Sequence, residues 1–340
     1  LAGSDIRFIR NASRLPAGAT VAVWGSRKPE GLPADCAILT IEDGFLRSVG
    51  LGADLTQPLS WVCDNLGIYY NSRTPSQLDR ILQETDFDAA LAARARALRA
   101  RILEAGITKY NVGAASWRRP ETARKVILVP GQVEGDASLR LGAPGIKTNI
   151  DLLRAVRAAE PDAYVLYKPH PDVVAGLREK GWGEADAASW CNEIVVSASM
   201  AQILEQVDEV HTLTSLTGFE ALMRGRRVVC YGQPFYAGWG LTTDLAPIGH
   251  RRRRLSLDEL VAGSLILYPA YVSRITGRFT TPERAVQELV AWRETGGGEL
   301  LLWRRILRPL FSLLKKLASA PGLRRANPAS AGGMETSHGR

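Results

Sequence analysis

The fold is decided by the stretch Val207-Asp-Glu-Val-His-Thr-Leu-Thr-Ser-Leu-Thr-Gly-Phe-Glu-Ala-Leu-Met223, in which a short strand leads through a turn into a helix. The residues up to Leu213 include the apolar end of a buried strand, and those from Phe219 onward have the three-and-four spacing of a helix face. Small hydroxyl residues and a glycine lie between them. The first N–H groups of such a helix and its dipole suit a phosphate or a carboxylate, although an ordinary N-cap has the same composition.

The length and charge of the chain limit its organisation and its partners. A chain of 340 residues exceeds one typical core, so we expect two domains of ordinary size. The sequence is 46% hydrophobic and 23% charged, which is typical of a soluble globular protein. A formal net charge of +8 favours an anionic partner, which composition alone leaves open between nucleic acid, a membrane and a small substrate.

The cysteines give no sign of a zinc site or a disulfide framework. Cys36, Cys63, Cys191 and Cys230 are scattered without a C-x-x-C pair, which indicates buried free thiols in a reducing compartment. No stretch reaches the roughly 20 apolar residues that span a bilayer, and no secretory signal precedes the first predicted strand. Because the sequence starts at Leu1, a piece of a longer protein is one expectation.

Residues 1–118 predict a first Rossmann-like domain. Short apolar runs typical of parallel strands occur in it, and one of them leads directly into Glu42-Asp-Gly-Phe-Leu-Arg-Ser48. Ligands of open α/β sheets bind outside the carboxyl ends of strands, so the acids of this segment are candidates for chemistry. Strands are predicted over 21–25, 37–41 and 68–70, and helices from 75 onward and over 87–105.

A polar linker over 117–124 introduces a second Rossmann-like domain over 119–295. Strand, loop and helix alternate in it as in the first half. Strands are predicted over 125–130, 163–167, 193–196 and 227–231, in addition to the opening stretch, and a helix over 149–159. This repetition predicts an α/β fold of two Rossmann-like domains that face one another across a cleft.

Basic residues gather in two places towards the end of the chain. The run Arg251–Arg254 lacks interleaved aromatics, which favours solvated charge or an anion-facing loop over nucleic-acid binding. Residues 296–326 predict a basic amphipathic helix that either lies on an anionic membrane surface or packs on its own domain. The polar tail over 327–340 is expected to be disordered.

Charged groups follow the predicted strands of both halves. Proline on both sides of His170 restricts the backbone and aims the imidazole. If the halves face each other, these groups and the turn at 214–218 converge on one cleft. Such a cleft would combine three groups. A helix end would hold a phosphate, a cation would stabilise the phosphate as it leaves, and a carboxylate would attack or accept a proton. This combination predicts group transfer off a phosphate. The charged groups are Glu42 and Asp43 in the first half, and Glu134, Asp136, Lys168 and His170 in the second.

Several segments between about residues 20 and 280 resemble the capsule polysaccharide β-Kdo transferases of the KpsC type. These segments are Glu42-Asp-Gly-Phe-Leu-Arg-Ser-Val-Gly-Leu-Gly52, Gly67-Ile-Tyr-Tyr70, Gln132-Val-Glu-Gly-Asp-Ala-Ser138, Tyr167-Lys-Pro-His-Pro-Asp172, Leu213-Thr-Ser-Leu-Thr-Gly-Phe-Glu220, Tyr231-Gly-Gln-Pro-Phe-Tyr-Ala-Gly-Trp-Gly-Leu-Thr242 and Tyr268-Pro-Ala-Tyr271.

The resemblance implies a GT-B-like fold, with the first domain on the acceptor side and the second binding the CMP-sugar. It implies transfer of the acidic sugar Kdo from CMP-Kdo to a lipid-linked Kdo acceptor, with retention through a covalent intermediate. It implies no cofactor beyond the donor substrate and no metal. The location implied is cytoplasmic and peripheral to the inner membrane, with its anionic surface as a partner and nucleic acid excluded.

The resemblance also implies roles for individual residues. Asp136 is the expected nucleophile, and Glu42 or Asp43 is the expected acid/base, with an exchange of these roles left open; Glu134 completes the catalytic set. Donor binding is expected from Gln132, Lys168, His170, Ser215, Thr217, Gly218 and Glu220. The chain departs from the family in two ways, because it holds one module where the full KpsC protein holds two, and because Gly135 stands where a further acid is expected.

Two other functions fit the same parts. A sugar-nucleotide epimerase or hydrolase can use the same two-half architecture. The module can also be a non-catalytic glycolipid-binding partner of a capsule export complex.

Overall fold

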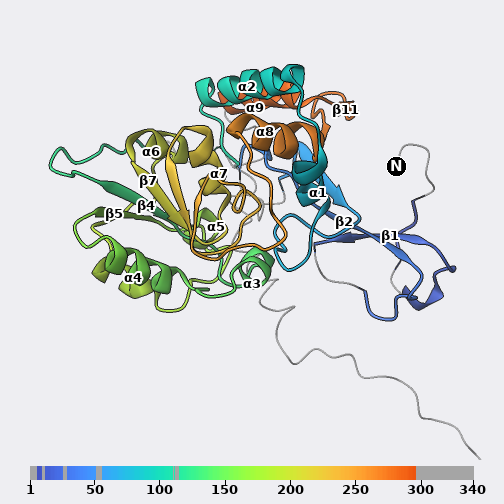
Figure 1. The fold of residues 1–340 in the computed structure, drawn as a ribbon, viewed down its shortest axis with the longest axis horizontal. Helices are drawn as coiled ribbons and strands as arrows, with labels where there is room; N and C mark the ends of the chain where they lie inside the picture. Colours follow the sequence, from blue (N-terminus) through green and yellow to red (C-terminus); the bar gives the residue numbers. More distant parts are fainter. Residues whose placement is uncertain are drawn as a thin grey trace, which may run out of the picture. The chain divides into compact units, whose positions relative to one another are not determined.

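Two β-sheets and the helices around them form the part of the chain that the computed structural model describes, residues 6–9, 12–25, 29–50, 56–109, 111 and 115–295 (Figure 1). Residues Leu1–Gly297 form one compact unit. The fold is mixed α/β, as predicted. The helix expected over 296–326 and the tail over 327–340 lie outside the described residues.

The second sheet is parallel throughout and has the strand order β6-β5-β4-β7-β8-β9. Its central strands β4 and β7 are buried at every position, as a parallel sheet between helices requires, although only β4 is a continuous apolar run and β7 has the sequence Glu-Val-His-Thr. The strands are β4 (Val126–Pro130), β5 (Tyr164–Lys168), β6 (Glu193–Ile194), β7 (Glu209–Thr212), β8 (Arg227–Cys230) and β9 (Thr243–Asp244). The strands predicted from the sequence in this half are therefore confirmed.

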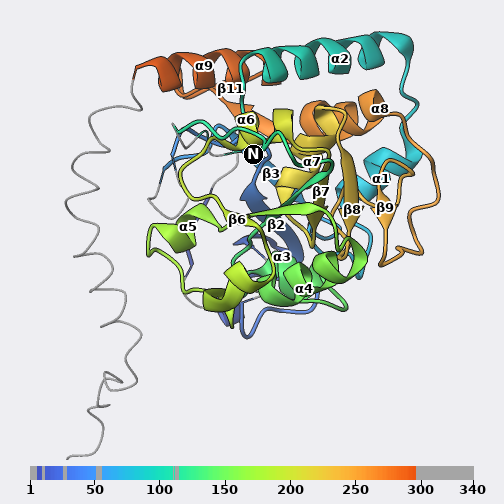
Figure 2. The same cartoon turned by 90° about the vertical axis from the view of Figure 1, so that its left-hand side faces the viewer.

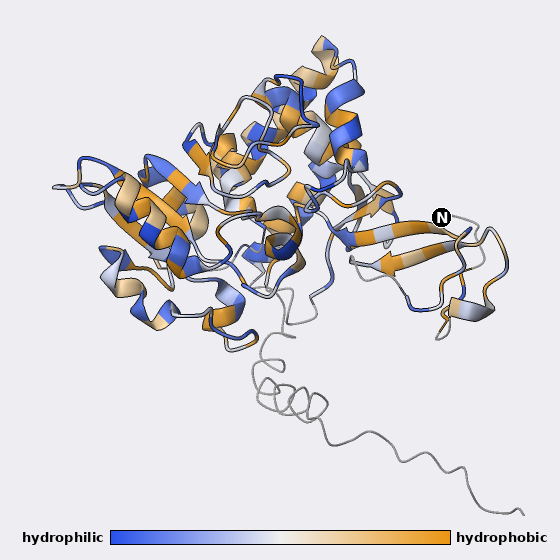
Figure 3. Cartoon of the chain, turned by 60° about the horizontal axis from the view of Figure 1, so that its bottom comes forward, coloured by the Kyte–Doolittle hydropathy of each residue, from blue (hydrophilic) through white to orange (hydrophobic). Residues whose placement is uncertain are grey.

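Short helices connect the strands of the parallel sheet. They are α3 (Ala137–Gly142), α4 (Asn149–Ala159), α5 (Pro171–Val174), η3 (Glu184–Ser189), α6 (Met200–Gln206) and α7 (Leu216–Met223). In the hydropathy view, the central strands are hydrophobic and the covering helices show mixed faces (Figure 3). The β4, β5 and β7 carboxyl ends consequently meet at one edge, where the loops to α3, α5 and α7 begin.

The first sheet is mixed, with the strand order β1-β2-β3-β10-β11. Only β1 and β2 pair in parallel, so a fully parallel Rossmann-like sheet is confirmed for the second sheet and is wrong for the first. The strands are β1 (Thr20–Trp24), β2 (Ala37–Asp43), β3 (Ser60–Asp64), β10 (Ala270–Val272) and β11 (Phe279–Thr280). The predicted domain boundaries stay a prediction, but β10 and β11 fall within 119–295 and pair with the sheet of the other half.

The strand predicted over Ile68–Tyr70 is wrong, because this segment is a turn that the Asn71 N–H closes on the Ile68 carbonyl at 2.9 Å. Two of its side chains are buried: Ile68 is 3% exposed and Tyr70 is 8% exposed. Core packing, rather than sheet pairing, accounts for their hydrophobicity. The sequence analysis missed β3, whose residues alternate between buried and half-buried.

A group of helices packs together beside the first sheet. It comprises α1 (Gln77–Glu84), α2 (Ala89–Glu104), α8 (Leu257–Val261), its π-helical continuation η4 (Ala262–Leu267) and α9 (Pro282–Glu294). Figures 1 and 2 both show α2 alongside α9 and α8, and Arg94 bridges to Glu283 while Arg96 bridges to Asp258. A Cβ at Gly263 would overlap the Leu82 side chain, which indicates how closely η4 and α1 approach. Distant parts of the sequence are thereby held in one unit.

The arginine run is structural. The Arg251 side chain is fully buried, donates to Asp79 Oδ1 at 2.7 Å and to the Ala237 carbonyl at 2.8 Å, and lies over the Trp239 ring. Arg253 donates to the Thr85 carbonyl at 2.7 Å. The prediction that this run is solvated or faces an anion is therefore wrong for Arg251. Its partner Asp79 lies far away in the sequence, and hydrophobic periodicity does not reveal such a contact.

Cys36, Cys63, Cys191 and Cys230 are free thiols, as expected, although only Cys230 is fully buried. In the described ranges, no helix combines the length and the apolar character needed to cross a bilayer.

Candidate active site

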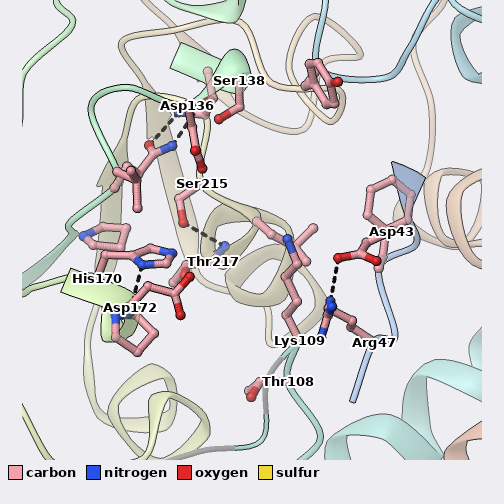
Figure 4. A pocket seen from close by; sticks show the side chains of 18 of the residues that line it. Asp43, Arg47, Thr108, Lys109, Asp136, Ser138, His170, Asp172, Ser215 and Thr217 are labelled. Carbon is pink, nitrogen blue, oxygen red and sulfur yellow. Dashed lines mark hydrogen bonds and ion pairs between the residues drawn. The ribbon is translucent and has the colours of Figure 1, made fainter. Parts of the chain in front are cut away.

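A pocket of about 830 Å³ opens where loops from both sheets meet (Figure 4). From the first sheet come Glu42 and Asp43, at the end of β2. The loops after β4, β5 and β7 supply the other side. The pocket brings together all predicted site residues except Glu134 and Gly218, namely Glu42, Asp43, Gln132, Asp136, Lys168, His170, Ser215, Thr217 and Glu220.

The turn before α7 lies on the second-sheet side of the pocket. Ser215 is the N-cap residue, and its Oγ accepts from the Thr217 N–H at 3.2 Å, so the ordinary capping role is real. The Ser215 and Thr217 side chains nevertheless line the pocket beside the positive end of the helix dipole. Gly218 faces away, because a Cβ there would overlap the Tyr236 ring, whose hydroxyl donates to the Ser215 carbonyl. Tyr236 therefore supports the turn from behind.

Gln132 positions this turn. Its side-chain Nε2 donates to Thr214 Oγ1 and its Oε1 accepts from the Thr214 N–H, both at 2.9 Å. The Gln132 backbone is in turn held by Asn149, which accepts from its N–H and donates to its carbonyl at 2.8 Å. The amide expected to bind donor thus joins the loop after β4 to the turn before α7.

His170 and Lys168 lie at the end of β5. Burial, together with the nearby charges of Lys109 and Arg178, lowers the pKa of His170 to about 4, so the ring is neutral at pH 7. Its Nδ1 accepts from the Asp172 N–H at 3.2 Å, which places the ring proton on Nε2. Burial lowers the pKa of Lys168 to about 8, and its Nζ donates to the Val196 carbonyl at 3.0 Å. The ammonium therefore remains mostly charged at pH 7.

The two acids at the end of β2 have different environments. Burial raises the pKa of Glu42; the Asp43 N–H donates to its Oε1 at 3.0 Å and opposes this shift. Asp43 is paired with Arg47 through Oδ2. Its Oδ1 is buried and, within the described part of the chain, has no hydrogen-bond partner. The raised pKa moves Glu42 towards the range in which a carboxyl group can act as an acid/base.

Asp136 occupies the N-cap position of α3, but its carboxylate makes no capping hydrogen bond. The side chain is 43% exposed, and Arg178 lies 3.8 Å from Oδ1. Figure 4 shows Asp136 and Ser215 on one side of the pocket and Asp43 with Arg47 on the other. Asp136, the expected nucleophile, and Asp43, one of the two candidates for the acid/base, thus face one cavity from different sheets.

Glu134 has a structural position. Its Oε1 accepts from the Asn149 N–H and its Oε2 from the Trp182 N–H, both at 2.8 Å, so the carboxylate fastens the start of α4 and does not line the pocket. Glu220 does line the pocket, but its carboxylate is nearly buried and accepts from the Lys109 N–H at 2.8 Å. Burial raises the pKa of Glu220.

Lys109 is a pocket residue that no sequence pattern identified. Its side chain lies between Thr217 and the Asp43–Arg47 pair (Figure 4). Burial raises the pKa of Glu42 and lowers that of His170; the charge of Lys109 opposes the first shift and adds to the second, so it acts on both sides of the pocket. Lys109 belongs to the segment after α2, where no periodicity marks it, and its position depends on Glu220, far along the chain. Arg47 and Arg178 also line the pocket; a search for cations near the predicted acids could have found Arg47.

Known proteins match most of the chain. The family profile described as capsule polysaccharide biosynthesis protein matches residues 19–115 and 89–280. The chain is 49% identical over 294 residues to the capsule polysaccharide modification protein LipA of Neisseria meningitidis serogroup A, covering 84% of this chain and 42% of LipA. It is 41% identical over 275 residues to the lipopolysaccharide-processing protein LpsZ of Rhizobium meliloti, covering 78% and 62%. The chain thus spans about half the length of these relatives.

Two solved structures have the same fold. Both come from Thermosulfurimonas dismutans KpsC. The β-Kdo 2,7 transferase is 42% identical, with a TM-score of 0.68, and the match covers 81% of this chain and 85% of that one. The β-Kdo 2,4 transferase is 32% identical, with a TM-score of 0.69 and coverage of 79% and 86%. The resemblance to KpsC-type transferases inferred from the motifs is confirmed, and the chain belongs to the capsule polysaccharide biosynthesis protein family.

Proposed function

We propose that the chain is a retaining β-Kdo glycosyltransferase module with a GT-B-like arrangement, which moves Kdo from CMP-Kdo to a lipid-linked, Kdo-terminated acceptor. One observation carries the proposal: Lys168, His170 and the start of α7 face the Glu42–Asp43 pair across one pocket. The similarity to both KpsC transferases supports the sugar and the reaction class.

The donor phosphate would lie against the start of α7. The helix dipole, the Thr217 hydroxyl and the charged Lys168 ammonium all favour an anion there. His170 contributes a neutral Nε2–H donor, which binds a phosphate oxygen without a change of protonation between pH 6 and 8. The same groups stabilise the CMP phosphate as it leaves.

Retention follows from two displacements. The Asp136 carboxylate attacks the anomeric carbon of Kdo, the bond from that carbon to the phosphate oxygen breaks, and CMP leaves with the electron pair. The acceptor hydroxyl then attacks the same carbon, its proton passes to Glu42, and the bond to Asp136 breaks to restore the carboxylate. The Asp136 side chain makes no capping hydrogen bond and is 43% exposed, so it is accessible for attack. Burial raises the pKa of Glu42, which suits it to proton transfer.

The similarity also favours one linkage. The chain is 42% identical to the 2,7 transferase and 32% identical to the 2,4 transferase, with nearly equal TM-scores. We propose 2,7 linkage, which NMR of the product formed on a synthetic Kdo acceptor would test. A 2,4-linked product would contradict it.

The decisive variant is Asp136→Asn, which keeps the shape of the side chain and removes the nucleophile. We expect a loss of transfer of at least about 10²–10⁴-fold, with an unchanged dissociation constant for CMP by calorimetry. Asp151→Asn, a similarly exposed aspartate on α4, is the matched control and should transfer normally. Mass spectrometry of Glu42→Gln with CMP-Kdo should show a Kdo adduct on Asp136. Wild-type turnover by Asp136→Asn would contradict the mechanism, and equal CMP release without acceptor would indicate a hydrolase.

We also propose that the module works at the cytoplasmic face of the inner membrane, which the capsule-related relatives support. Flotation with anionic vesicles, before and after deletion of residues 300–317, tests whether the predicted basic helix attaches it. Unchanged flotation would exclude that helix as the anchor.

A further inference from the structure

Two tryptophans of the first sheet form an aromatic pair in the wall of the pocket. Trp24 ends β1 and Trp61 lies on β3, and their rings meet edge to face with centroids 5.5 Å apart at an interplanar angle of 85°. Both line the pocket, together with Gln57 and Pro58. Trp24 is 54% exposed, although tryptophan is usually well covered in folded proteins. The pair therefore presents aromatic surface to the cavity.

Strand register places this pair beside the acids. Trp61 is the direct antiparallel partner of Asp43, and Trp24 is the parallel partner of Ile41. Directly paired residues, and residues two apart on one strand, share a sheet face, so both tryptophans lie on the face of Asp43. Gly25 follows Trp24, and a Cβ placed there would lie 3.8 Å from Glu42 Oε2. The register therefore places the aromatic pair on the face of Asp43, whereas Glu42 and Gly25 belong to the opposite face, and all but Gly25 line the same pocket. The phosphate side belongs to the other sheet.

We propose that Trp24 and Trp61 form the acceptor subsite, in which the apolar face of a sugar ring stacks on the indoles. This inference rests on the proposed function. An acid/base must lie within about 2.6–3.2 Å of the hydroxyl that it deprotonates, so the acceptor ring must lie against the groups around the Glu42–Asp43 pair. On the first-sheet face those groups are the two indoles, with the Gln57 amide at the rim.

The surroundings of the two tryptophans favour a sugar over two other ligands with an apolar surface, an acyl chain and the cytosine of the donor. An acyl chain here would cover Glu42 and Asp43 and remove water from two carboxylates, which is costly. The cytosine of the donor is joined through its ribose to the phosphate, so it would lie on the far side of the reacting carbon, near α5 and α7 and away from the tryptophans. A sugar ring offers both an apolar face for stacking and hydroxyls for Gln57 and Asp43.

The test uses a methyl glycoside of Kdo, which has no lipid. We expect Trp24→Ala to raise its KM about tenfold or more while leaving kcat at saturation within about twofold, and Trp24→Phe to retain most of the affinity. CMP binding by calorimetry should be unchanged. Trp182→Ala is the matched control, because Trp182 is 71% exposed and lies outside the pocket lining.

Direct binding separates this inference from the proposed function. Saturation-transfer NMR with the methyl glycoside requires no turnover, and the signal should be lost in Trp24→Ala and kept in Trp182→Ala. If transfer fails but this pattern holds, the subsite stands and the proposed reaction falls. An unchanged KM and an unchanged NMR signal in Trp24→Ala, or an equal weakening of CMP binding, would overturn the subsite.

Discussion

The neutral state of His170 can be tested through the pH dependence of stability. The pKa of this side chain falls from 6.5 to about 4 on folding, mainly because of burial. At a pH between these two pKa values, the unfolded chain binds a proton at His170 that the folded chain does not. The contribution of His170 to the free energy of unfolding is therefore fully present above pH 6.5 and is lost as the pH falls towards 4. At pH 5.0 the loss from this residue amounts to about 2 kcal/mol.

The variant His170→Asn isolates that contribution. Asparagine can accept the Asp172 N–H as an N-cap residue, and it does not titrate. Urea unfolding of both proteins at pH 7.5 and 5.0 should show that the wild type loses about 2 kcal/mol more than the variant. All other titrating groups are common to both proteins and cancel in this difference. Equal losses in the two proteins would refute the neutral, buried imidazole.

NMR gives a direct second measurement. The His170 ring should titrate near 4, and its nitrogen shifts at pH 7 should show the proton on Nε2, because Nδ1 accepts from Asp172. A pKa near 6.5, or a proton on Nδ1, would remove the basis for a pH-independent donor at the phosphate.

Two further predictions concern the supports of the site. Gly218→Ala should cost about 1–3 kcal/mol in the free energy of unfolding and weaken CMP binding, because the new methyl overlaps the Tyr236 ring; Gly145→Ala, with open space around it, should be neutral. Arg251→Met should cost about 3–5 kcal/mol by leaving Asp79 in a buried, broken pair, whereas Arg80→Met, from a fully exposed pair, should leave the free energy of unfolding nearly unchanged. Urea unfolding checks both, and a Gly218→Ala protein as stable as Gly145→Ala, or equal costs for the two arginines, would contradict them.

The parallel sheet could be predicted because β4, β5 and β8 have apolar runs bounded by loops, and because Val207, Val210 and Leu213 mark β7. The first sheet could not, because β10 and β11 are two or three residues long and acquire partners only in three dimensions. Ile68–Tyr70 has the apolar character of a strand for a different reason, which is burial in a turn. Local patterns therefore identified elements stabilised by their own sequence and missed those stabilised by distant partners.

The same distinction applies to the site. Groups at strand ends, such as Asp136 and His170, could be placed because the strands themselves were recognisable. Glu134 lies in the same loop as Asp136, yet hydrogen bonds to Asn149 and Trp182 turn it to a structural role that no local pattern reveals. The Lys109 backbone donates to Glu220 and accepts from the Ser48 N–H, so distant segments fix its place in the pocket.

The pairing of β3 with β10 also bears on how the protein is made. The ribosome completes all strands of the parallel sheet, residues 126–244, before it reaches Ala270, about 200 residues after β3. Through that interval the β3 edge exposes unpaired N–H and C=O groups, which can pair with another chain. We expect nascent or truncated chains that end before β10 to aggregate through this edge, and chaperone demand to be greatest in the last part of synthesis.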